Sequence, residues 1–158
     1  PVTFYKSTEQ LPEFTDYSME NRTYRYFKGE PQYAFGYGLS YTDFEFGEAL
    51  LSSSSIKAGE KVEITIPLTN VGKMDGAEVV QVYVKSLTKS LKGYVRQEIK
   101  AGKSEKVRIT LEPESFAYYN ADVDGLKVFP GKCQILYGNS SRDMDLSSLD
   151  LEVTPAVQ

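Results

Sequence analysis

The strongest constraint on the fold is an alternation of apolar and polar residues that recurs along the chain from Lys61 onward. Successive side chains of a strand point to opposite faces of a sheet, so a period of two predicts strands with one buried face. No stretch has the 3.6-residue apolar period of an amphipathic helix, and residues 112–120 leave room for one short turn at most. The residues expected to be buried are Val62, Ile64, Ile66, Val80, Val82, Val84, Val107, Ile109, Leu111 and Ile135.

Turn sequences such as Asn70-Val71-Gly72, Asp124-Gly125 and Pro130-Gly131 separate these runs. About seven short strands spaced by turns are typical of an all-β fold, and they predict an immunoglobulin-like or fibronectin type III-like β-sandwich over residues 43–158. Proline has no N–H to donate to a neighbouring strand. We therefore expect the strand that contains Pro67 to lie at a sheet edge or to carry a bulge.

Aromatic side chains are concentrated before the sandwich, since 13 of the 20 Tyr and Phe residues lie within residues 1–46. Such a segment cannot bury its rings alone, so we expect residues 1–42 to form an irregular, aromatic-rich N-terminal arm. Its rings Tyr24, Tyr26, Phe35, Tyr37 and Tyr41 should pack on the sandwich or on another domain. The serine run at residues 52–55 fits a flexible linker, a strand edge or a loop.

The composition excludes most routes to catalysis. The chain has no histidine and one cysteine, which excludes a Ser-His-Asp triad, a Cys-His dyad, a His-ligated metal site and an internal disulfide within it. A net charge of −4 predicts no nucleic-acid partner, and the short apolar runs predict no membrane span. We therefore expect no catalytic, cofactor-binding or metal-binding residue in this chain, and no cofactor.

Several motifs have a structural and a functional interpretation. The carboxylates Glu13, Asp16, Glu30 and Asp43 lie among the aromatic residues, but nothing in their spacing pairs two of them as glycoside hydrolysis requires. Gly36-Tyr37-Gly38 lacks the third glycine of a dinucleotide site, so we expect a tight turn.

Three further motifs remain. Cys133 alternates with buried positions and has no accompanying base, which favours a buried thiol. Asn21-Arg22-Thr23 and Asn139-Ser140-Ser141 fit the glycosylation pattern, but their side chains also suit turns. Of Tyr118 and Tyr119, either one forms a tyrosine corner with the backbone, or one ring is buried and the other exposed.

Residues 22–42 read RTYRYFKGEPQYAFGYGLSYT. They closely resemble the segment of glycoside hydrolase family 3 that joins the second catalytic-region domain to the C-terminal domain, with Ala34 where that family usually has proline. Residues 2–19 look like the chain that leaves the preceding α/β domain. Residues 70–84 and 91–120 are similar to later motifs of the family. Residues 130–144, PGKCQILYGNSSRDM, are similar to its ending, with Cys133 where an aromatic residue is usual.

The resemblance implies a C-terminal fibronectin type III-like domain with its preceding linker, in a retaining β-glucosidase or β-xylosidase. In that family an Asp nucleophile and a Glu acid/base belong to domains that would lie upstream of Pro1, and no residue here matches either motif. The expected function is a non-catalytic module that supports those domains. Its expected partners are the upstream catalytic domains of the same parent chain, and self-association into a homo-oligomer is a further expectation. Localisation is left open, with a periplasmic or secreted parent expected.

Two other functions stay open. Exposed Tyr and Phe rings would also suit a carbohydrate-binding module, because sugars stack on aromatic rings. The second alternative function is that of a generic interaction or adhesion domain with a sandwich fold. The start at Pro1-Val2-Thr3, without an initiator Met, leads us to expect a piece of a longer protein.

Overall fold

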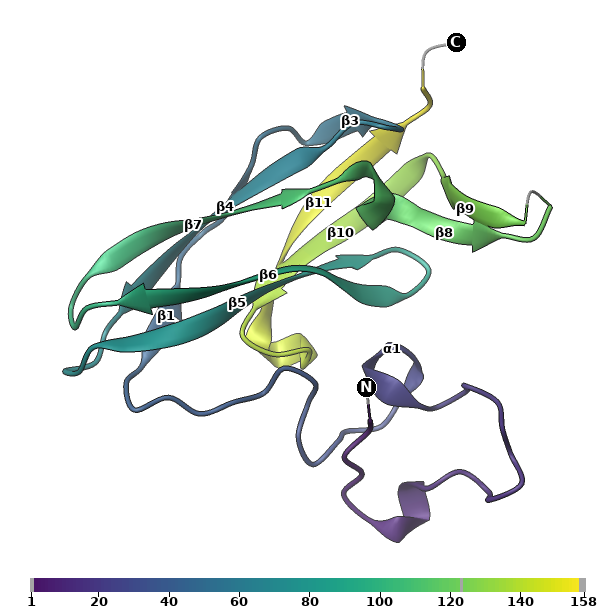
Figure 1. The fold of residues 1–158 in the computed structure, drawn as a ribbon, viewed down its shortest axis with the longest axis horizontal. Coiled ribbons are helices and arrows are strands. Elements are labelled where there is room, and N and C mark those ends of the chain that lie inside the picture. Colours follow the sequence, from purple (N-terminus) through teal and green to yellow (C-terminus); the bar gives the residue numbers. More distant parts are fainter. Residues whose placement is uncertain (1, 123, 157–158) are drawn as a thin grey trace.

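The computed structural model describes residues 2–122 and 124–156 and contains a β-sandwich with an irregular N-terminal arm (Figure 1). This confirms the predicted fold class. The helical elements are η1 (Thr8–Gln10), α1 (Thr23–Tyr26), η2 (Pro113–Phe116) and η3 (Asp143–Asp145). The strands are β1 (Phe44–Phe46), β2 (Leu50–Leu51), β3 (Ser55–Lys57), β4 (Val62–Asn70), β5 (Gly76–Lys85), β6 (Lys89–Ile99), β7 (Ser104–Leu111), β8 (Ala117–Asn120), β9 (Gly125–Val128), β10 (Gly131–Gly138) and β11 (Leu146–Thr154).

Two sheets form the sandwich. In the first, β4 pairs with β7 along one edge and with β1 and then β2 along the other, all antiparallel. The second sheet has the order β3-β11-β10-β5-β6, in which β3 and β11 are the parallel pair. The strands β8 and β9 form a separate hairpin that projects from one end of the sandwich (Figure 1).

The core lies between the two sheets. All the side chains that the alternation predicts to be inside are buried there, with Ile109 the most exposed of them at 6%. Ala49, Ile99, Phe116, Cys133 and Leu151 join them. The period of two was therefore a reliable guide to the inward face of the long strands.

The prediction that the Pro67 strand lies at a sheet edge is wrong, because β4 has neighbours on both sides. The carbonyl of Pro67 accepts a hydrogen bond from the N–H of Gly47 at 2.8 Å. On that side of β4, the pairing with β1 ends at Phe46 and the pairing with β2 starts at Leu50, which leaves a gap in the ladder. The missing N–H of proline faces this interruption, so no ladder bond is lost. The alternative prediction for this strand was a bulge. The pairing of β4 with β7 has no register shift over the described residues, whereas β5 and β6 have one at Val82 and Tyr83.

The serine run carries the chain from one sheet to the other. The N–H of Ser52 donates to the carbonyl of Glu63 at 2.9 Å, and the carbonyl of Ser54 accepts from the N–H of Glu152 at 3.0 Å. These bonds attach the run to a strand of each sheet, which matches the strand-edge interpretation and not the flexible linker. Among the described residues, the six longer strands β4 to β7, β10 and β11 come close to the seven expected, and the short strands β1 to β3 and the β8–β9 hairpin add to them.

Before β1, the described part of the arm holds η1, α1 and one isolated bridge between Phe4 and Tyr33. In Figure 1 the arm, drawn in purple, forms a wide loop at one end of the molecule, and the following segment runs along the sandwich to β1. The division of the chain at residues 42 and 43 stays a prediction. Within the described residues, no helix is long and apolar enough to cross a membrane.

Candidate functional site

The centre of β5 is buried on both faces. Val80, Val82 and Val84 point into the core, whereas Gln81 and Tyr83 alternate with them and face outward. The outward pair should be exposed in a half-buried strand, but Gln81 is only 3% exposed and Tyr83 is fully buried. The arm contacts both side chains, Tyr83 through Tyr24 and Gln81 through Gly36.

A cluster of three aromatic rings joins the arm to the second sheet. The ring of Tyr24, on α1, stacks on Phe35 with centroids 4.5 Å apart and meets Tyr83 edge-on at 5.9 Å. Such pairs stabilise a contact beyond the area they bury. The hydroxyl of Tyr24 also accepts a hydrogen bond from the N–H of Leu91 on β6 at 3.0 Å. Burial raises the pKa of Tyr83, so its hydroxyl stays protonated and serves as a donor.

The amide of Gln81 connects three parts of the chain. Its Nε2 donates to the carbonyl of Gly36 at 3.0 Å and to that of Asn139, just after β10, at 2.7 Å. Its Oε1 accepts from the hydroxyl of Tyr83 at 2.6 Å. Both ends of this buried side chain are satisfied, as buried amides must be to avoid a desolvation cost. Nearby, the N–H of Ser141 donates to the carbonyl of Phe35 at 2.8 Å.

Gly36 allows the arm to approach this closely. Its φ is +80°, which disfavours any residue with a side chain, and a Cβ there would lie 2.1 Å from Oε1 of Gln81. The N–H of Tyr37 donates to the carbonyl of Ala34 at 3.1 Å, which closes the tight turn expected at Gly36-Tyr37-Gly38. The glycine pattern predicted this turn, but it did not predict the contact of the turn with β5.

A second attachment lies where the arm enters β1. The hydroxyl of Thr42 donates to Oδ1 of Asn70 at 2.8 Å, and Nδ2 of the same buried Asn70 donates to the carbonyls of Met74 and Ile99 at 2.8 and 2.9 Å. Gly72 packs so closely that an added Cβ would lie 2.0 Å from Oγ1 of Thr42. The segment between Ala34 and Thr42 is therefore held at both ends.

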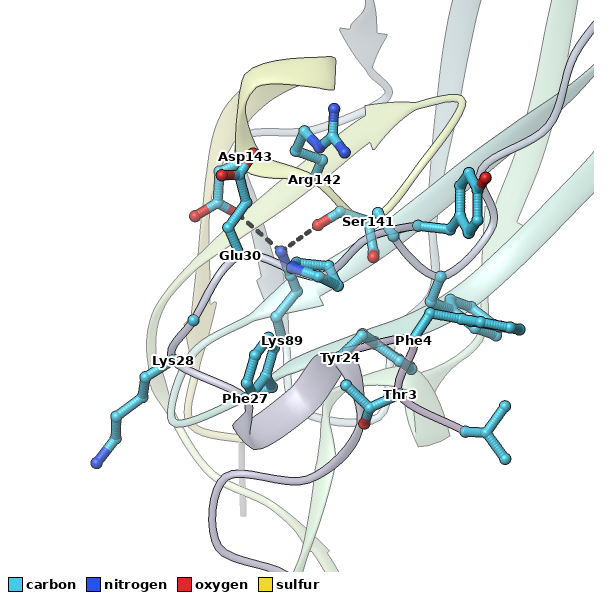
Figure 2. Close-up of a pocket in the computed structure, with 16 residues that line it drawn as sticks. Thr3, Phe4, Tyr24, Phe27, Lys28, Glu30, Lys89, Ser141, Arg142 and Asp143 are labelled. Carbon is cyan, nitrogen blue, oxygen red and sulfur yellow. Dashed lines mark hydrogen bonds and ion pairs between the residues drawn. The ribbon is translucent and has the colours of Figure 1, made fainter. Parts of the chain in front are cut away.

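A hollow of about 320 Å³ separates the arm from the loop that follows β10 (Figure 2). Figure 2 shows Lys89 between the two walls, where its Nζ donates to the carbonyl of Ser141 at 2.5 Å and to Asp143 at 2.7 Å. The bond from Lys89 holds the pKa of Asp143 below its usual value. Nε of Arg142 is buried and has no hydrogen-bond partner within the described residues. Aromatic residues of the arm, among them Tyr24 and Phe27, line the opposite wall.

Large apolar side chains elsewhere on the arm are exposed. Phe14 and Tyr17 are 91% and 88% exposed, and Leu39 and Tyr41 are exposed to a similar extent. Of the rings expected to pack, Tyr24 contacts the sandwich and Phe35 stacks on Tyr24, whereas Tyr26 and Tyr37 are partly exposed and Tyr41 is almost fully exposed. The arm thus combines a part bonded to the second sheet with large apolar side chains left in solvent.

Two of the four carboxylates singled out in the sequence have structural partners. Oδ1 of Asp16 accepts from the N–H of Ser18 at 2.8 Å, and Glu30 pairs with Lys6 at 2.6 Å. These bonds hold the pKa of both carboxyls below their usual values. Glu13 is exposed, and the backbone carbonyl of Asp43 accepts from the N–H of Val71. Over residues 2–122 and 124–156, no group of three His, Cys, Asp or Glu side chains is arranged to hold a metal ion.

Both asparagine motifs lie at turns. Asn21 has a φ of +56°, and its Oδ1 accepts from the N–H of Lys28 at 3.0 Å. Nδ2 of Asn139 donates to Oε2 of Glu78 at 3.3 Å. The bond of Asn21 is the local kind that suits a turn, whereas Asn139 bonds to a side chain of β5.

The hydroxyls of Tyr118 and Tyr119 bond to side chains, and a buried tyrosine bonded to the backbone is found at Tyr137. The hydroxyl of the half-buried Tyr118 accepts from Ser86, and that of the exposed Tyr119 donates to Asp124 at 2.6 Å. The hydroxyl of buried Tyr137 accepts from the N–H of Ala49 at 3.1 Å and donates to the carbonyl of Gly47 at 3.2 Å. Sequence reasoning missed this bond because its partners are distant in the chain, although Tyr137 alternates in phase with Ile135.

Comparisons with known proteins place these features in a family. A model of the fibronectin type III-like domain matches residues 78–141. A xylan 1,4-beta-xylosidase of Xylanibacter ruminicola is 44% identical over 95% of this chain and 18% of its own length. A thermostable beta-glucosidase B of Acetivibrio thermocellus is 38% identical over 78% of this chain and 18% of its own length.

Solved structures agree with this match. A beta-glucosidase from intestinal bacteria, described as involved in saponin metabolism, superposes with a TM-score of 0.80 at 28% identity. That alignment covers 96% of this chain and 22% of the other. The chain therefore spans about a fifth of the length of the curated relatives it matches. These two alignments cover 95% and 96% of the chain, so they extend over most of the arm as well as the sandwich.

Proposed function

We propose that this chain, which belongs to the fibronectin type III-like domains of glycoside hydrolase family 3, serves as a non-catalytic C-terminal module of a retaining β-glycosidase. The observation that carries the proposal is the arm, which is bonded to the second sheet through Gly36 and Gln81 and presents Phe14 and Tyr17 to solvent. The arm acts as a strap that supports the catalytic domains of the same parent chain.

The parent's reaction is the hydrolysis of β-xylosides or β-glucosides, by exo action from a chain end. The names of the relatives support this choice, because they are β-xylosidases and β-glucosidases. A retaining mechanism requires two carboxyl groups about 5–5.5 Å apart across the glycosidic bond. The acidic residues of the arm do not support such a role here, since Asp16 and Glu30 are occupied by local hydrogen bonds. The catalytic pair belongs to the remainder of the parent.

The strap stabilises the parent by burying its exposed rings on a catalytic domain. Each large ring that moves from water into a packed interface contributes roughly 1.5–3 kcal/mol. Exposed apolar side chains gathered on one segment are typical of an interaction surface. The same surface would mediate self-association when the catalytic domains are absent.

The test is an assay of the isolated chain on aryl β-xylosides and aryl β-glucosides, together with calorimetric titration with xylo- and cello-oligosaccharides. The proposal predicts no turnover above background and no saturable binding. Turnover that is lost when Asp16 or Glu30 is replaced by its amide would overturn the non-catalytic role. Saturable binding that is lost in Tyr33→Ala or Tyr37→Ala, but kept in Tyr94→Ala, would establish a carbohydrate-binding module instead.

A further inference from the structure

Two positively charged side chains lie close together where the arm meets the second sheet. The hydroxyl of Tyr24 on α1 accepts a hydrogen bond from the N–H of Leu91 on β6 at 3.0 Å. The residues that follow this bonded pair are Arg25 on α1 and Lys92 on β6. Arg25 is exposed and Lys92 is half-buried. Desolvation, and after it the charge of Arg25, lowers the pKa of Lys92, which agrees with a short separation between the two charges.

A β-bulge sets the position of Lys92. Val82 of β5 pairs with Gly93 of β6. The next residue of β5 pairs with Leu91, so Lys92 has no residue opposite it. An extra residue of this kind bends its strand and re-aims a side chain. Because β6 is the last strand of its sheet and α1 contacts it, the bulge places a lysine at the sheet edge beside the arm.

No carboxylate of this chain is paired with the two cations. Over residues 2–122 and 124–156, neither Arg25 nor Lys92 forms an ion pair. By contrast, Lys89 on the same strand is paired with Asp143 at 2.7 Å. Two like charges at a partly desolvated site repel each other, and a carboxylate that contacts both would remove this cost. A guanidinium can also hold a carboxylate by two parallel hydrogen bonds.

The first described residues of the chain lie close to this pair. Oγ1 of Thr3 accepts a hydrogen bond from the N–H of Thr23, the first residue of α1, at 2.7 Å. Figure 1 shows the N-terminus next to α1. Under the proposed function the catalytic domains precede this chain, so they join it next to α1, close to the two cations.

We propose that Arg25 and Lys92 bind an acidic surface of the catalytic part of the parent, with a carboxylate between the guanidinium and the ammonium group. This inference rests on the proposed function and deepens it, because it names the chemistry of the surface that the strap meets. The exposed aromatic side chains of the arm are not directional in their packing. The paired charges fix the orientation in which the two surfaces meet.

The test compares the isolated chain with a chimera, in which this chain replaces the matching segment of the Xylanibacter ruminicola β-xylosidase. Arg25→Glu should have opposite effects in the two. In the isolated chain the new carboxylate faces Lys92, so the melting temperature should not fall. In the chimera it faces the carboxylate of the partner surface, so the melting temperature should fall by about 2 °C or more. Salt at about 1 M shortens the Debye length to about 3 Å and should reduce that fall.

Arg108→Glu is the matched control, because it makes the same change of charge at an exposed position of β7 in the other sheet. It should leave the melting temperature unchanged in both contexts. Lys92→Gln removes the second cation and should lower the melting temperature of the chimera in the same direction as Arg25→Glu. An equal fall in the chimera and in the isolated chain would overturn the proposal, because Arg25 would then act within this chain.

Two other outcomes also contradict the proposal. If the isolated chain dimerises at low salt and Arg25→Glu abolishes the dimer, the carboxylate comes from a second copy. If Arg25→Glu leaves the chimera unchanged while Phe14→Ala with Tyr17→Ala destabilises it, the charge pairing is wrong and the proposed function stands. If neither change affects the chimera, the docking of the arm itself is contradicted.

Discussion

At the residue scale, the close contact between the arm and β5 depends on the absence of a Cβ at Gly36. Gly36→Ala would place a Cβ 2.1 Å from Gln81 in a backbone conformation with φ of +80°. We expect a loss of about 1–3 kcal/mol in the free energy of unfolding, measured by urea titration. Gly38→Ala is the control, since its Cβ would meet nothing within 4 Å. Equal unfolding midpoints for the two variants would mean that Gly36 does not anchor the arm.

Cys133 gives the fold a pH dependence at the alkaline end. Burial raises the pKa of its thiol from 9.0 to about 11, so the folded chain keeps a proton that the unfolded chain loses between those values. Stability is therefore fully present below pH 9 and falls as the pH rises toward 11, by at most about 1.4 kcal/mol per pH unit. Urea unfolding at pH 8, 9 and 10 should show a steeper decline for the wild type than for Cys133→Ala. Parallel declines would show that the thiol is not effectively buried.

Individual residues also mark what sequence could and could not predict. The burial of Cys133 and the turn at Gly36 followed from alternation and from glycine chemistry, which are local signals. The role of Pro67 depended on where a neighbouring strand is interrupted, and the role of Tyr137 on partners such as Gly47 far along the chain. Such pairings leave no local pattern, so sequence reasoning misplaced the strand of Pro67 and did not reveal the bonds of Tyr137.

At the scale of elements, a substitution in β7 tests which face of the strand packs in the core. Ile109 lies between exposed neighbours, is 6% exposed and belongs to the core cluster. Ile109→Ala should cost about 2–5 kcal/mol of unfolding free energy, because it removes buried methyl groups and leaves a cavity. The exposed neighbour Arg108 provides the control, and Arg108→Ala should change stability by less than about 0.5 kcal/mol. Comparable losses in both variants would contradict the inward assignment of this face.

Truncation of the arm tests whether the sandwich is stable without it. A chain of residues 43–158 would expose Tyr83 and the amide of Gln81 on the outer face of the second sheet. We expect this short chain to melt below the full chain and to aggregate, since roughly 1.5–3 kcal/mol is lost per uncovered large side chain. A chain of residues 20–158, which keeps Tyr24, Phe35 and Gly36, should melt close to the full chain. Equal melting of both truncated chains would show that the fold needs no arm.

The apolar alternation identified the inward face of β4, β5 and β7, but it did not show that the outer face of β5 is also covered. In β5 the outward residues Gln81 and Tyr83 are buried by the arm, which no period within β5 could reveal. The projecting β8–β9 hairpin was not predicted, because its short strands carry little apolar alternation.

At the scale of the whole molecule, a sandwich core is combined with an arm that is bonded to it and that carries exposed aromatic side chains. The chain matches about a fifth of its β-xylosidase and β-glucosidase relatives, and that match includes the arm. A segment that is bonded to one domain and exposes large apolar side chains is suited to pack on a second domain. The central claim is therefore that Phe14 and Tyr17 pack on the catalytic part of the parent.

The most direct measurement compares melting temperatures in two contexts. In the first, this chain replaces the matching segment of the Xylanibacter ruminicola β-xylosidase, to which it is 44% identical. The second context is the isolated chain. The test variant carries Phe14→Ala and Tyr17→Ala, and the control carries Tyr94→Ala and Tyr119→Ala, whose rings are 69% and 64% exposed.

We predict that the arm variant lowers the melting temperature of the chimeric enzyme, because two rings worth roughly 1.5–3 kcal/mol each lose their interface. The control variant should leave that temperature unchanged, and neither variant should alter the melting of the isolated chain. A chimeric enzyme that melts at the same temperature with and without Phe14 and Tyr17 would contradict the account.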